Sequence, residues 1–296
     1  MLFALAGTIA FAFRPVLIKL AYAATAAETA AAAQVSATTL LFLRMGLALP
    51  FFAAAAWWLR REAPIARRDW AGIVGLGFIG YYLASLLDFV GLQYVPAGLG
   101  RLIMFLYPTL VVILSAIFLG RKSSAREIAA LAMTYAGIAL VLSRQFGASP
   151  EHRLFLFGAA LIFSAAMCYA VYLVTGSQLI QRIGSMRFTA YTMMISTVPA
   201  LIQFGLLEGP QALELPPAVW GYAILLATAC TVLPVFLVAE ALRRIGVNHF
   251  ALIGALGPVT TVLADFALLG GALSPLQLAG GTLVITGVLL VTLKKG

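Results

Sequence analysis

Tyr107–Gly120 reads YPTLVVILSAIFLG, and 150 residues later Gly257–Gly270 reads GPVTTVLADFALLG. Each stretch carries a proline near the start of an apolar run and ends the run with glycine. Sliding the chain against itself by 150 residues brings further pairs into register without a gap. Apolar matches arise readily in membrane proteins, so the matched small and polar residues are the informative ones. They are Pro108 with Pro258, Gly120 with Gly270, Ser124 with Ser274, and Gly137 with Gly287.

The composition indicates a membrane protein. Hydrophobic residues make up 63% of the 296 residues and charged residues only 10%, whereas soluble domains carry about 25% charged residues. A transmembrane helix needs about 20 mostly apolar residues, and ten such runs remain when the sequence is cut at its charged, Pro and Gly clusters. We therefore expect an all-α polytopic membrane protein with ten transmembrane helices. The runs cover approximately 2–22, 37–59, 70–92, 97–119, 126–144, 155–176, 188–207, 217–240, 247–270 and 275–293.

Ten spans and the 150-residue offset together predict two repeats of five helices, at residues 1–145 and 154–296. Because five is odd, the second repeat enters the membrane from the opposite side. Inverted repeats of this kind are typical of secondary transporters, which bind substrate near the bilayer midplane between the two halves.

Basic residues gather in alternate loops, thirteen on one side of the membrane against Arg144 and Arg153 on the other. Positive loops stay cytoplasmic, so we expect a multi-pass protein of the inner (plasma) membrane with both termini in the cytoplasm. The net charge of +9 is then mostly a topology signal, and we expect no nucleic-acid partner. The thirteen residues are Arg60, Arg61, Arg67, Arg68, Arg121, Lys122, Arg126, Arg182, Arg187, Arg243, Arg244, Lys294 and Lys295.

Several stretches resemble a known family. Residues 108–141, PTLVVILSAIFLGRKSSAREIAALAMTYAGIALV, resemble the signature of the EamA-type drug/metabolite transporter superfamily. FAFRPVLIKLA (11–21) and LLFLRMGLALP (40–50) are similar to that family's first two helices, with Lys19 and Arg44 at its usual basic positions. The resemblance covers nearly the whole chain and implies two EamA repeats that transport a small molecule.

The same resemblance leaves the substrate open, because the superfamily moves amino acids, purines, sugars, organic cations and other compounds. The length, the ten expected helices and the YPTL stretch are similar to those of an aromatic amino acid exporter in this superfamily. Two features depart from the family pattern. Phe13 and Arg14 stand where many members have a tryptophan and small residues, and Met194 stands opposite Arg44 in the second repeat.

Ionisable residues inside the spans are expensive, at about 2.5–3.5 kcal/mol or more at the bilayer centre. Counted at about 1.5 Å per residue, all of them but Arg14 fall in the outer third of their spans. One interpretation is structural pairing, for example of Asp88 with Arg101, with Lys19 and Arg44 extending toward the interface. The other is an extracellular gate or a substrate site, for which Lys19, Arg44, Asp88 and Arg101 are the candidates. The full set is Arg14, Lys19, Arg44, Asp88, Arg101 and Asp265.

Aromatic residues at mid-span supply further candidates. Phe78, Tyr82 and Phe89 are spaced to share one face of a regular helix over 70–92, and Tyr169 lies in the middle of 155–176. Ordinary packing explains each of them equally well, but a tyrosine hydroxyl in hydrocarbon needs a partner. We therefore add Phe78, Tyr82 and Tyr169 to the substrate-binding candidates. His249 follows the turn after 217–240 and is either an interface residue or a contact to the substrate or inner gate.

Pro108 and Pro258 lie about eleven residues into their spans. Proline removes a backbone hydrogen bond and clashes with the preceding turn, so each residue is expected to kink its helix. The kinks are either static or gating hinges.

These observations favour a secondary transporter that exports small amphipathic metabolites by alternating access, with amino acids, including aromatic ones, as the leading substrates. Purines, sugars or organic cations are the alternative, and an intramembrane enzyme is a remote one. Asp88 and Asp265 lack the Gly-x-Gly-Asp motif of aspartyl proteases, and no metal-ligand spacing or Walker loop occurs. We therefore expect no cofactor or metal, a small-molecule substrate and the lipid bilayer as partners. The oligomeric state stays open.

Overall fold

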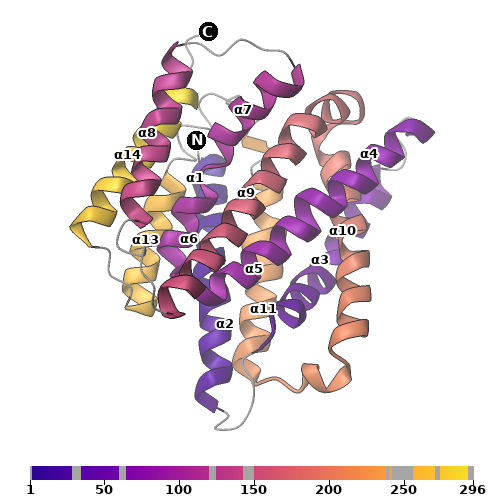
Figure 1. Ribbon diagram of the computed structural model, residues 1–296. Helices are drawn as coiled ribbons and strands as arrows, with labels where there is room; N and C mark the ends of the chain where they lie inside the picture. The colour runs from indigo at the N-terminus through magenta and orange to yellow at the C-terminus, as the bar shows by residue number, and fades with distance from the viewer. Residues whose placement is uncertain are drawn as a thin grey trace.

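The structure is a computed structural model, and the residues that it describes are almost entirely helical (Figure 1). No strand occurs in the described residues, which confirms the predicted all-α fold class. The described ranges are 2–28, 35–59, 65–119, 125–142, 150–237, 240–241, 256–270 and 274–292. The predicted candidate His249 lies outside them.

The helices follow one another along the chain without other regular structure between them. They are α1 (Leu2–Ala12), α2 (Arg14–Glu28), α3 (Ala37–Leu59), α4 (Arg67–Gly77), η1 (Phe78–Leu83), α5 (Ala84–Tyr94), α6 (Ala97–Met104), α7 (Tyr107–Leu119), α8 (Ala125–Leu142), α9 (Pro150–Ile183), α10 (Ser185–Leu207), η3 (Pro210–Leu213), α11 (Pro217–Ala227), η4 (Thr228–Val232), α13 (Leu256–Leu269) and α14 (Pro275–Thr292).

Seven described segments are long and apolar enough to cross a membrane. Three shorter apolar helices, Ile128–Gly137, Leu256–Leu269 and Leu278–Gly287, lie within the remaining three predicted runs. The polytopic membrane fold is therefore confirmed, while the count of ten spans stays a prediction. The seven segments are Leu2–Thr25, Ala37–Leu59, Arg67–Tyr94, Ala97–Phe118, Glu151–Gly176, Ser185–Leu207 and Pro217–Leu237.

Two spans are interrupted near their middles. The first is divided into α1 and α2 at Phe13 and the fourth into α6 and α7 at Phe105 and Leu106. Pro108 is thus the second residue of α7 and not the centre of a continuous kinked helix, which corrects the expectation for this proline. Proline is favoured in the first turn because the N–H that it lacks has no intrahelical partner there. Pro258 is likewise the third residue of the described helix α13.

Two spans contain a π-helical turn, η1 in the third and η4 in the eighth. They begin at Phe78 and Thr228, 150 residues apart, which is the offset that relates the sequence repeats. A π turn holds more residues than an α turn and so rotates the face of the helix beyond it. Phe78 is accordingly exposed while Phe89 is fully buried. The expected common face of Phe78, Tyr82 and Phe89 is therefore wrong.

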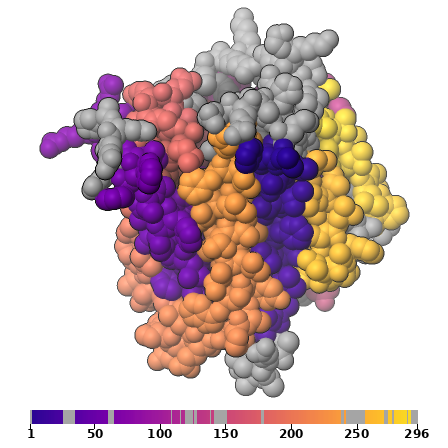
Figure 2. Space-filling view, turned by 180° about the vertical axis from the view of Figure 1, so that it is seen from behind, coloured from indigo at the N-terminus to yellow at the C-terminus, as the bar shows by residue number. Residues whose placement is uncertain are grey.

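The two halves of the chain interlock. Helices α1 and α2 pack against α11, η4 and α13, and Figure 2 shows them as an indigo strip between orange and yellow segments of the second half. In the opposite sense, α9 from the second half packs against α5, α6 and α7 of the first. The first span of each predicted repeat therefore lies beside the third and fourth spans of the other.

Polar contacts tie the helices together at both ends of the molecule. At the end where α4 begins and α9 ends (Figure 1), Arg182 Nη2 lies 3.1 Å from Asp69 Oδ1. At the other end, the Ser36 hydroxyl donates a hydrogen bond to the Glu208 carboxylate. The basic residues at the start of α4 and the end of α9 are thus brought to one side, as the predicted topology requires.

Helices α8 and α14 pack side by side at an approach that only glycine permits. A Cβ added at Gly137 would lie 2.6 Å from the Gly280 carbonyl oxygen, and one added at Gly287 would lie 2.8 Å from the Ala130 carbonyl oxygen. Backbone atoms cannot move aside as a flexible side chain can. Small residues that allow helix backbones to approach closely are a common basis of helix association in membranes.

We predict that Gly137→Ala or Gly287→Ala destabilises the protein by about 1–3 kcal/mol, because either change overpacks this contact. The melting temperature of the detergent-purified protein should fall by about 3–10 °C. Gly75→Ala is the matched control, since nothing lies within 4 Å of a Cβ at this exposed helical glycine. Alanine favours a helix more than glycine does, so Gly75→Ala should leave the melting temperature unchanged or raise it. Equal losses in all three variants would contradict the close approach.

Candidate functional site

The interruption of the first span places a charge in the middle of the molecule. Pro15 has no N–H to donate to the preceding turn, and α1 ends at Ala12 while α2 begins at Arg14. Arg14 therefore stands at the amino end of a half-helix, where the unpaired N–H groups carry a partial positive charge. Half-helix ends near the midplane are a recurring device of transporter binding sites.

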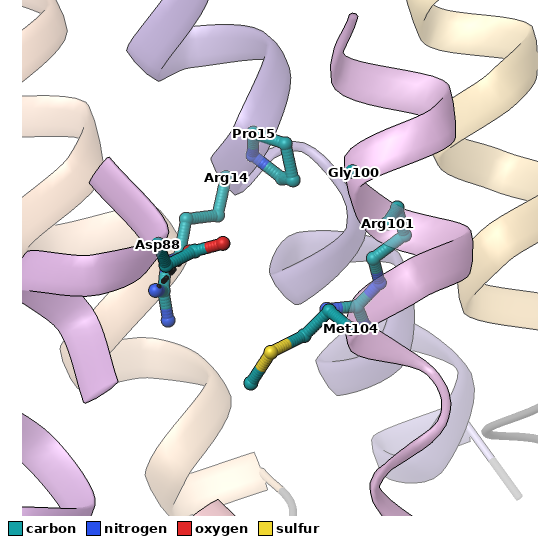
Figure 3. A pocket seen from close by; sticks show the side chains of 6 residues that line it. All are labelled: Arg14, Pro15, Asp88, Gly100, Arg101 and Met104. Atoms are coloured by element: carbon teal, nitrogen blue, oxygen red, sulfur yellow. Dashed lines mark hydrogen bonds and ion pairs between the residues drawn. The ribbon is translucent and has the colours of Figure 1, made fainter. Parts of the chain in front are cut away.

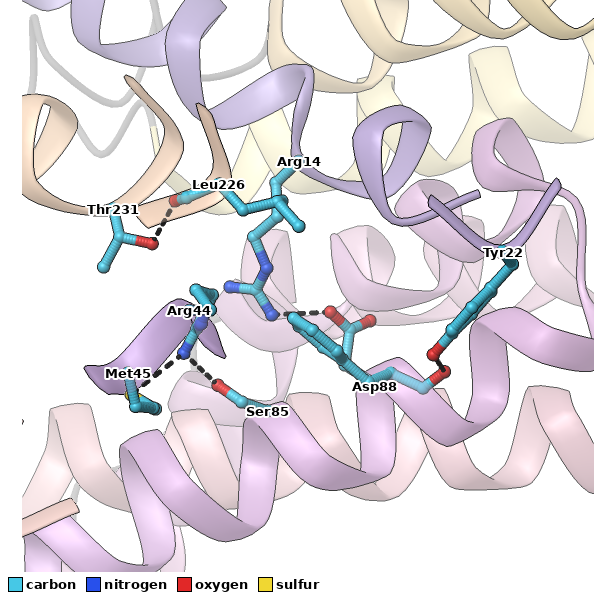
Figure 4. Close-up of polar contacts among 9 residues, drawn as sticks. Arg14, Tyr22, Arg44, Met45, Ser85, Asp88, Leu226 and Thr231 are labelled. Atoms are coloured by element: carbon cyan, nitrogen blue, oxygen red, sulfur yellow. Dashed lines mark hydrogen bonds and ion pairs between the residues drawn. The ribbon is translucent and has the colours of Figure 1, made fainter. Parts of the chain in front are cut away.

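Arg14 forms the principal ion pair of the interior. Its Nη2 lies 2.6 Å from Asp88 Oδ2, and the two side chains are 17% and 6% exposed (Figure 4). Asp88 therefore pairs with Arg14 and not with Arg101, the structural pairing considered from the sequence. The simple depth count assigned Arg14 to a different level because it assumed ten straight, parallel helices.

Arg44 lies beside this pair and is only 2% exposed. Its Nη2 lies 2.9 Å from the Ser85 hydroxyl and 3.5 Å from the Met45 sulfur. The Phe89 ring lies between the two arginines, with its centroid 5.3 Å from the Arg44 Cζ and 5.8 Å from the Arg14 Cζ. Cation–π contacts of this kind stabilise a desolvated guanidinium by up to about 2 kcal/mol, but they leave its charge in place.

Arg101 faces the Arg14–Asp88 pair across a cavity of about 280 Å³ (Figure 3). This volume is at the lower end of the range of about 300–1,000 Å³ for small-molecule sites. Among the described residues Arg101 makes no hydrogen bond or ion pair, and its Nε is buried without a partner. A guanidinium in this state is ready to receive a carboxylate. The cavity is lined by Arg14, Pro15, Asp88, Gly100, Arg101 and Met104.

A chain of tyrosines continues from Arg101. The guanidinium interacts electrostatically with Tyr107 and Tyr169, whose ring centroids are 5.1 Å apart. Tyr169 stacks on Tyr172 at 5.9 Å, and the Tyr172 hydroxyl donates to the Tyr81 hydroxyl at 3.3 Å. The predicted candidate Tyr169 thus joins Arg101 to an aromatic wall with several hydroxyl groups.

One face of α13 contacts both interrupted spans. A Cβ at Gly257 would lie 3.2 Å from Arg101 Nη2, and the Thr261 hydroxyl donates to the Ala12 carbonyl at 2.7 Å. One turn further, Asp265 accepts a hydrogen bond of 2.8 Å from the Gly98 amide at the start of α6. This spacing of four residues keeps all three contacts on one side of the helix.

The remaining candidates lie elsewhere. Lys19 interacts electrostatically with Asp265 and does not line the cavity. Tyr82 donates its hydroxyl to Gln203 Oε1 at 2.7 Å, on the side of α10. Phe78 is 44% exposed and packs against Tyr82 at a centroid distance of 5.2 Å. The site therefore brings together Arg44, Asp88, Arg101 and Tyr169, with Lys19, Tyr82 and Phe78 outside it.

Sequence reasoning missed the central position of Arg14 and the contribution of Tyr81 and Tyr107. The signal for Arg14 was present in the Arg-Pro pair at mid-span, since a proline there marks an interruption. No comparable signal identifies Tyr81, whose direction depends on the π turn η1. Tyr107 opens α7 only because α6 ends three residues earlier.

The arrangement can bind and orient a small carboxylate-bearing molecule: guanidinium groups for the carboxylate, one carboxylate of its own, and an aromatic wall. Within the described ranges no group of three or more His, Cys, Asp or Glu residues could hold a metal ion.

Comparison with known proteins agrees with a transport role. The EamA-like transporter family model matches residues 1–143 and 156–293. The chain is 30% identical to the uncharacterized transporter YcbK of Bacillus subtilis (strain 168), over 100% of this chain and 94% of that protein. A probable terminal-alkyne amino-acid exporter of Streptantibioticus cattleyicolor is 29% identical over 84% of this chain and 81% of its own length. The threonine/homoserine exporter RhtA of Escherichia coli (strain K12) is 28% identical over 69% and 64%.

Two family matches that together cover nearly the whole chain, and a relative of similar length at 30% identity, leave no part of the fold outside this group. The chain belongs to the EamA-like transporter family.

Proposed function

We propose that the protein is a secondary transporter that exports amino-acid-like compounds by alternating access. The observation that carries the proposal is the buried guanidinium of Arg101, which has no described partner and faces the Arg14–Asp88 pair across the cavity. The substrate carboxylate binds Arg101, while Asp88 offers the only carboxylate at the cavity to a substrate amino group. Two relatives named as amino-acid exporters support the same substrate class.

Aromatic amino acids belong to the proposed range. The rings of Tyr107 and Tyr169 continue the cavity wall beyond Arg101, and offset or edge-on aromatic contacts stabilise a bound ring by about 0.5–1.5 kcal/mol. Organic cations fit the site less well, because they would approach guanidinium groups of the same sign. An intramembrane enzyme would need a nucleophile or paired acids at the cavity, and its lining offers Asp88 alone.

Transport of a panel of labelled amino acids, nucleobases and organic cations into proteoliposomes tests the proposed function. We expect saturable transport of at least one amino acid, with counterflow driven by unlabelled amino acid inside. Transport of organic cations alone, or hydrolysis of a peptide substrate, would contradict the proposal.

A variant of the carboxylate site gives a sharper test. Arg101→Gln removes the guanidinium but keeps a hydrogen-bonding amide, and hydrogen bonds to charged groups contribute about 1.5–3 kcal/mol. Half-saturating amino-acid concentration should therefore rise at least about tenfold. Arg153→Gln is the matched control, because Arg153 lies exposed near the start of α9 and its loss should leave transport unchanged. If both variants transport alike, Arg101 does not bind the substrate.

The location and orientation of the protein form part of the proposal: the inner (plasma) membrane, with both termini in the cytoplasm. After replacement of Cys168 and Cys230 by alanine, single cysteines at Arg68 and Gln211 report the two ends. Both positions are exposed in the structure. In intact cells an impermeant maleimide should label Gln211→Cys and should reach Arg68→Cys only after the membrane is permeabilised. The reverse pattern would invert the topology.

A further inference from the structure

The charges around the cavity do not balance. Arg14, Arg44 and Arg101 contribute three positive charges at or beside the cavity, and Asp88 contributes one negative charge. Of the ten acidic residues in the chain, only Asp88 and Asp265 lie in the interior of the predicted spans. Asp265 is engaged with the Gly98 amide and the charge of Lys19. The cluster therefore carries a net charge of about +2 when all four groups are ionised, as their ordinary pKa values require at neutral pH.

The surplus is not hidden in weak contacts. Arg44 has only neutral hydrogen-bond partners, the Ser85 hydroxyl and the Met45 sulfur. Arg101 has none among the described residues, and the Nε atoms of Arg14, Arg44 and Arg101 are all buried without an acceptor. Helix dipoles change the total little, because the amino end of α2 begins at Arg14 while the carboxyl end of α6 lies beside Arg101.

An unpaired buried charge is strongly unfavourable, and each guanidinium can accept a carboxylate through two parallel hydrogen bonds. We propose that the cavity takes a substrate with a net negative charge, of the acidic amino acid or dicarboxylate class. This inference rests on the proposed function, because it concerns the substrate of the same cavity.

Charge counting separates this class from neutral amino acids. A neutral amino acid brings one carboxylate and one ammonium group, so it leaves the net charge of the cluster unchanged. Its ammonium group must also compete with Arg14 for Asp88, whose Oδ2 lies 2.6 Å from Arg14 Nη2. An acidic amino acid leaves one surplus positive charge, and a dicarboxylate leaves none. Affinity should therefore rise with each negative charge on a ligand of fixed shape.

Succinate, succinamate and succinamide provide that series, with two, one and no negative charges on the same carbon skeleton at pH 7. Glutamate and glutamine provide a matched pair that keeps the amino group. Dissociation constants are measured by thermal shift on the detergent-purified full chain at low ionic strength. We expect each added negative charge to tighten binding by about tenfold within either series. The inference is overturned if the uncharged partner binds as tightly as the charged one, or if no ligand of either series binds.

Variants connect the preference to the arginines. Arg44→Met removes one positive charge with an unbranched apolar side chain, and should reduce the preference for succinate over succinamate from about tenfold to about threefold or less. Should Arg44→Met fail to elute as a folded monodisperse protein, Arg101→Gln removes a charge from the less crowded side of the cavity and gives the same test. Arg153→Gln should keep the full preference. A preference that survives in both cavity variants would contradict the proposal.

The two ligand series also separate this inference from the proposed function. If the succinate series binds in the expected order but no amino acid binds or is transported, the charge inference stands and export of amino-acid-like compounds fails. If glutamine binds and is transported as well as glutamate, export of amino acids stands and the charge inference fails.

Discussion

Backbone amides and carbonyls have no water to pair with inside a bilayer, so a spanning segment must be helical except where other protein groups cover it. The irregular points of this chain obey that constraint. The interruption at Phe13 lies against α13, where the Thr261 hydroxyl takes up the Ala12 carbonyl. The interruption at Phe105 and Leu106 keeps its amides paired with the carbonyls of Arg101 and Ile103. Each interruption is thus a covered site near the centre of the molecule, and the charged residues gather between the two.

The same constraint explains why the cavity is built from arginine and tyrosine. A guanidinium distributes its charge over several N–H groups and stacks on aromatic rings, so Arg14 and Arg44 can share the Phe89 ring. Tyrosine adds hydroxyl groups that find partners in one another, as Tyr81 and Tyr172 do. A bound carboxylate would meet a surface that is polar in its hydrogen bonds and apolar in its area.

The sequence predicted the helical membrane fold, the positions of the spans and three charged residues of the site, because hydropathy and the cost of intramembrane charge depend on composition alone. It did not predict the partner of Asp88, since that depends on where α1 ends and how the spans tilt. The face occupied by Phe89 was also missed, because one π turn redirects every residue after it. Pro108 was placed inside a continuous helix, although the backbone ends α6 before the proline is reached.

The three contacts along one face of α13 have a consequence for how this helix can move. Gly257, Thr261 and Asp265 each touch a different part of the first half of the chain: the Arg101 guanidinium, the Ala12 carbonyl and the Gly98 amide. A rotation of α13 about its own axis would separate all three at once, so intermediate orientations would leave buried polar groups unpaired. The helix is therefore suited to switching between two discrete seats in an all-or-none manner, and a gradual drift is disfavoured.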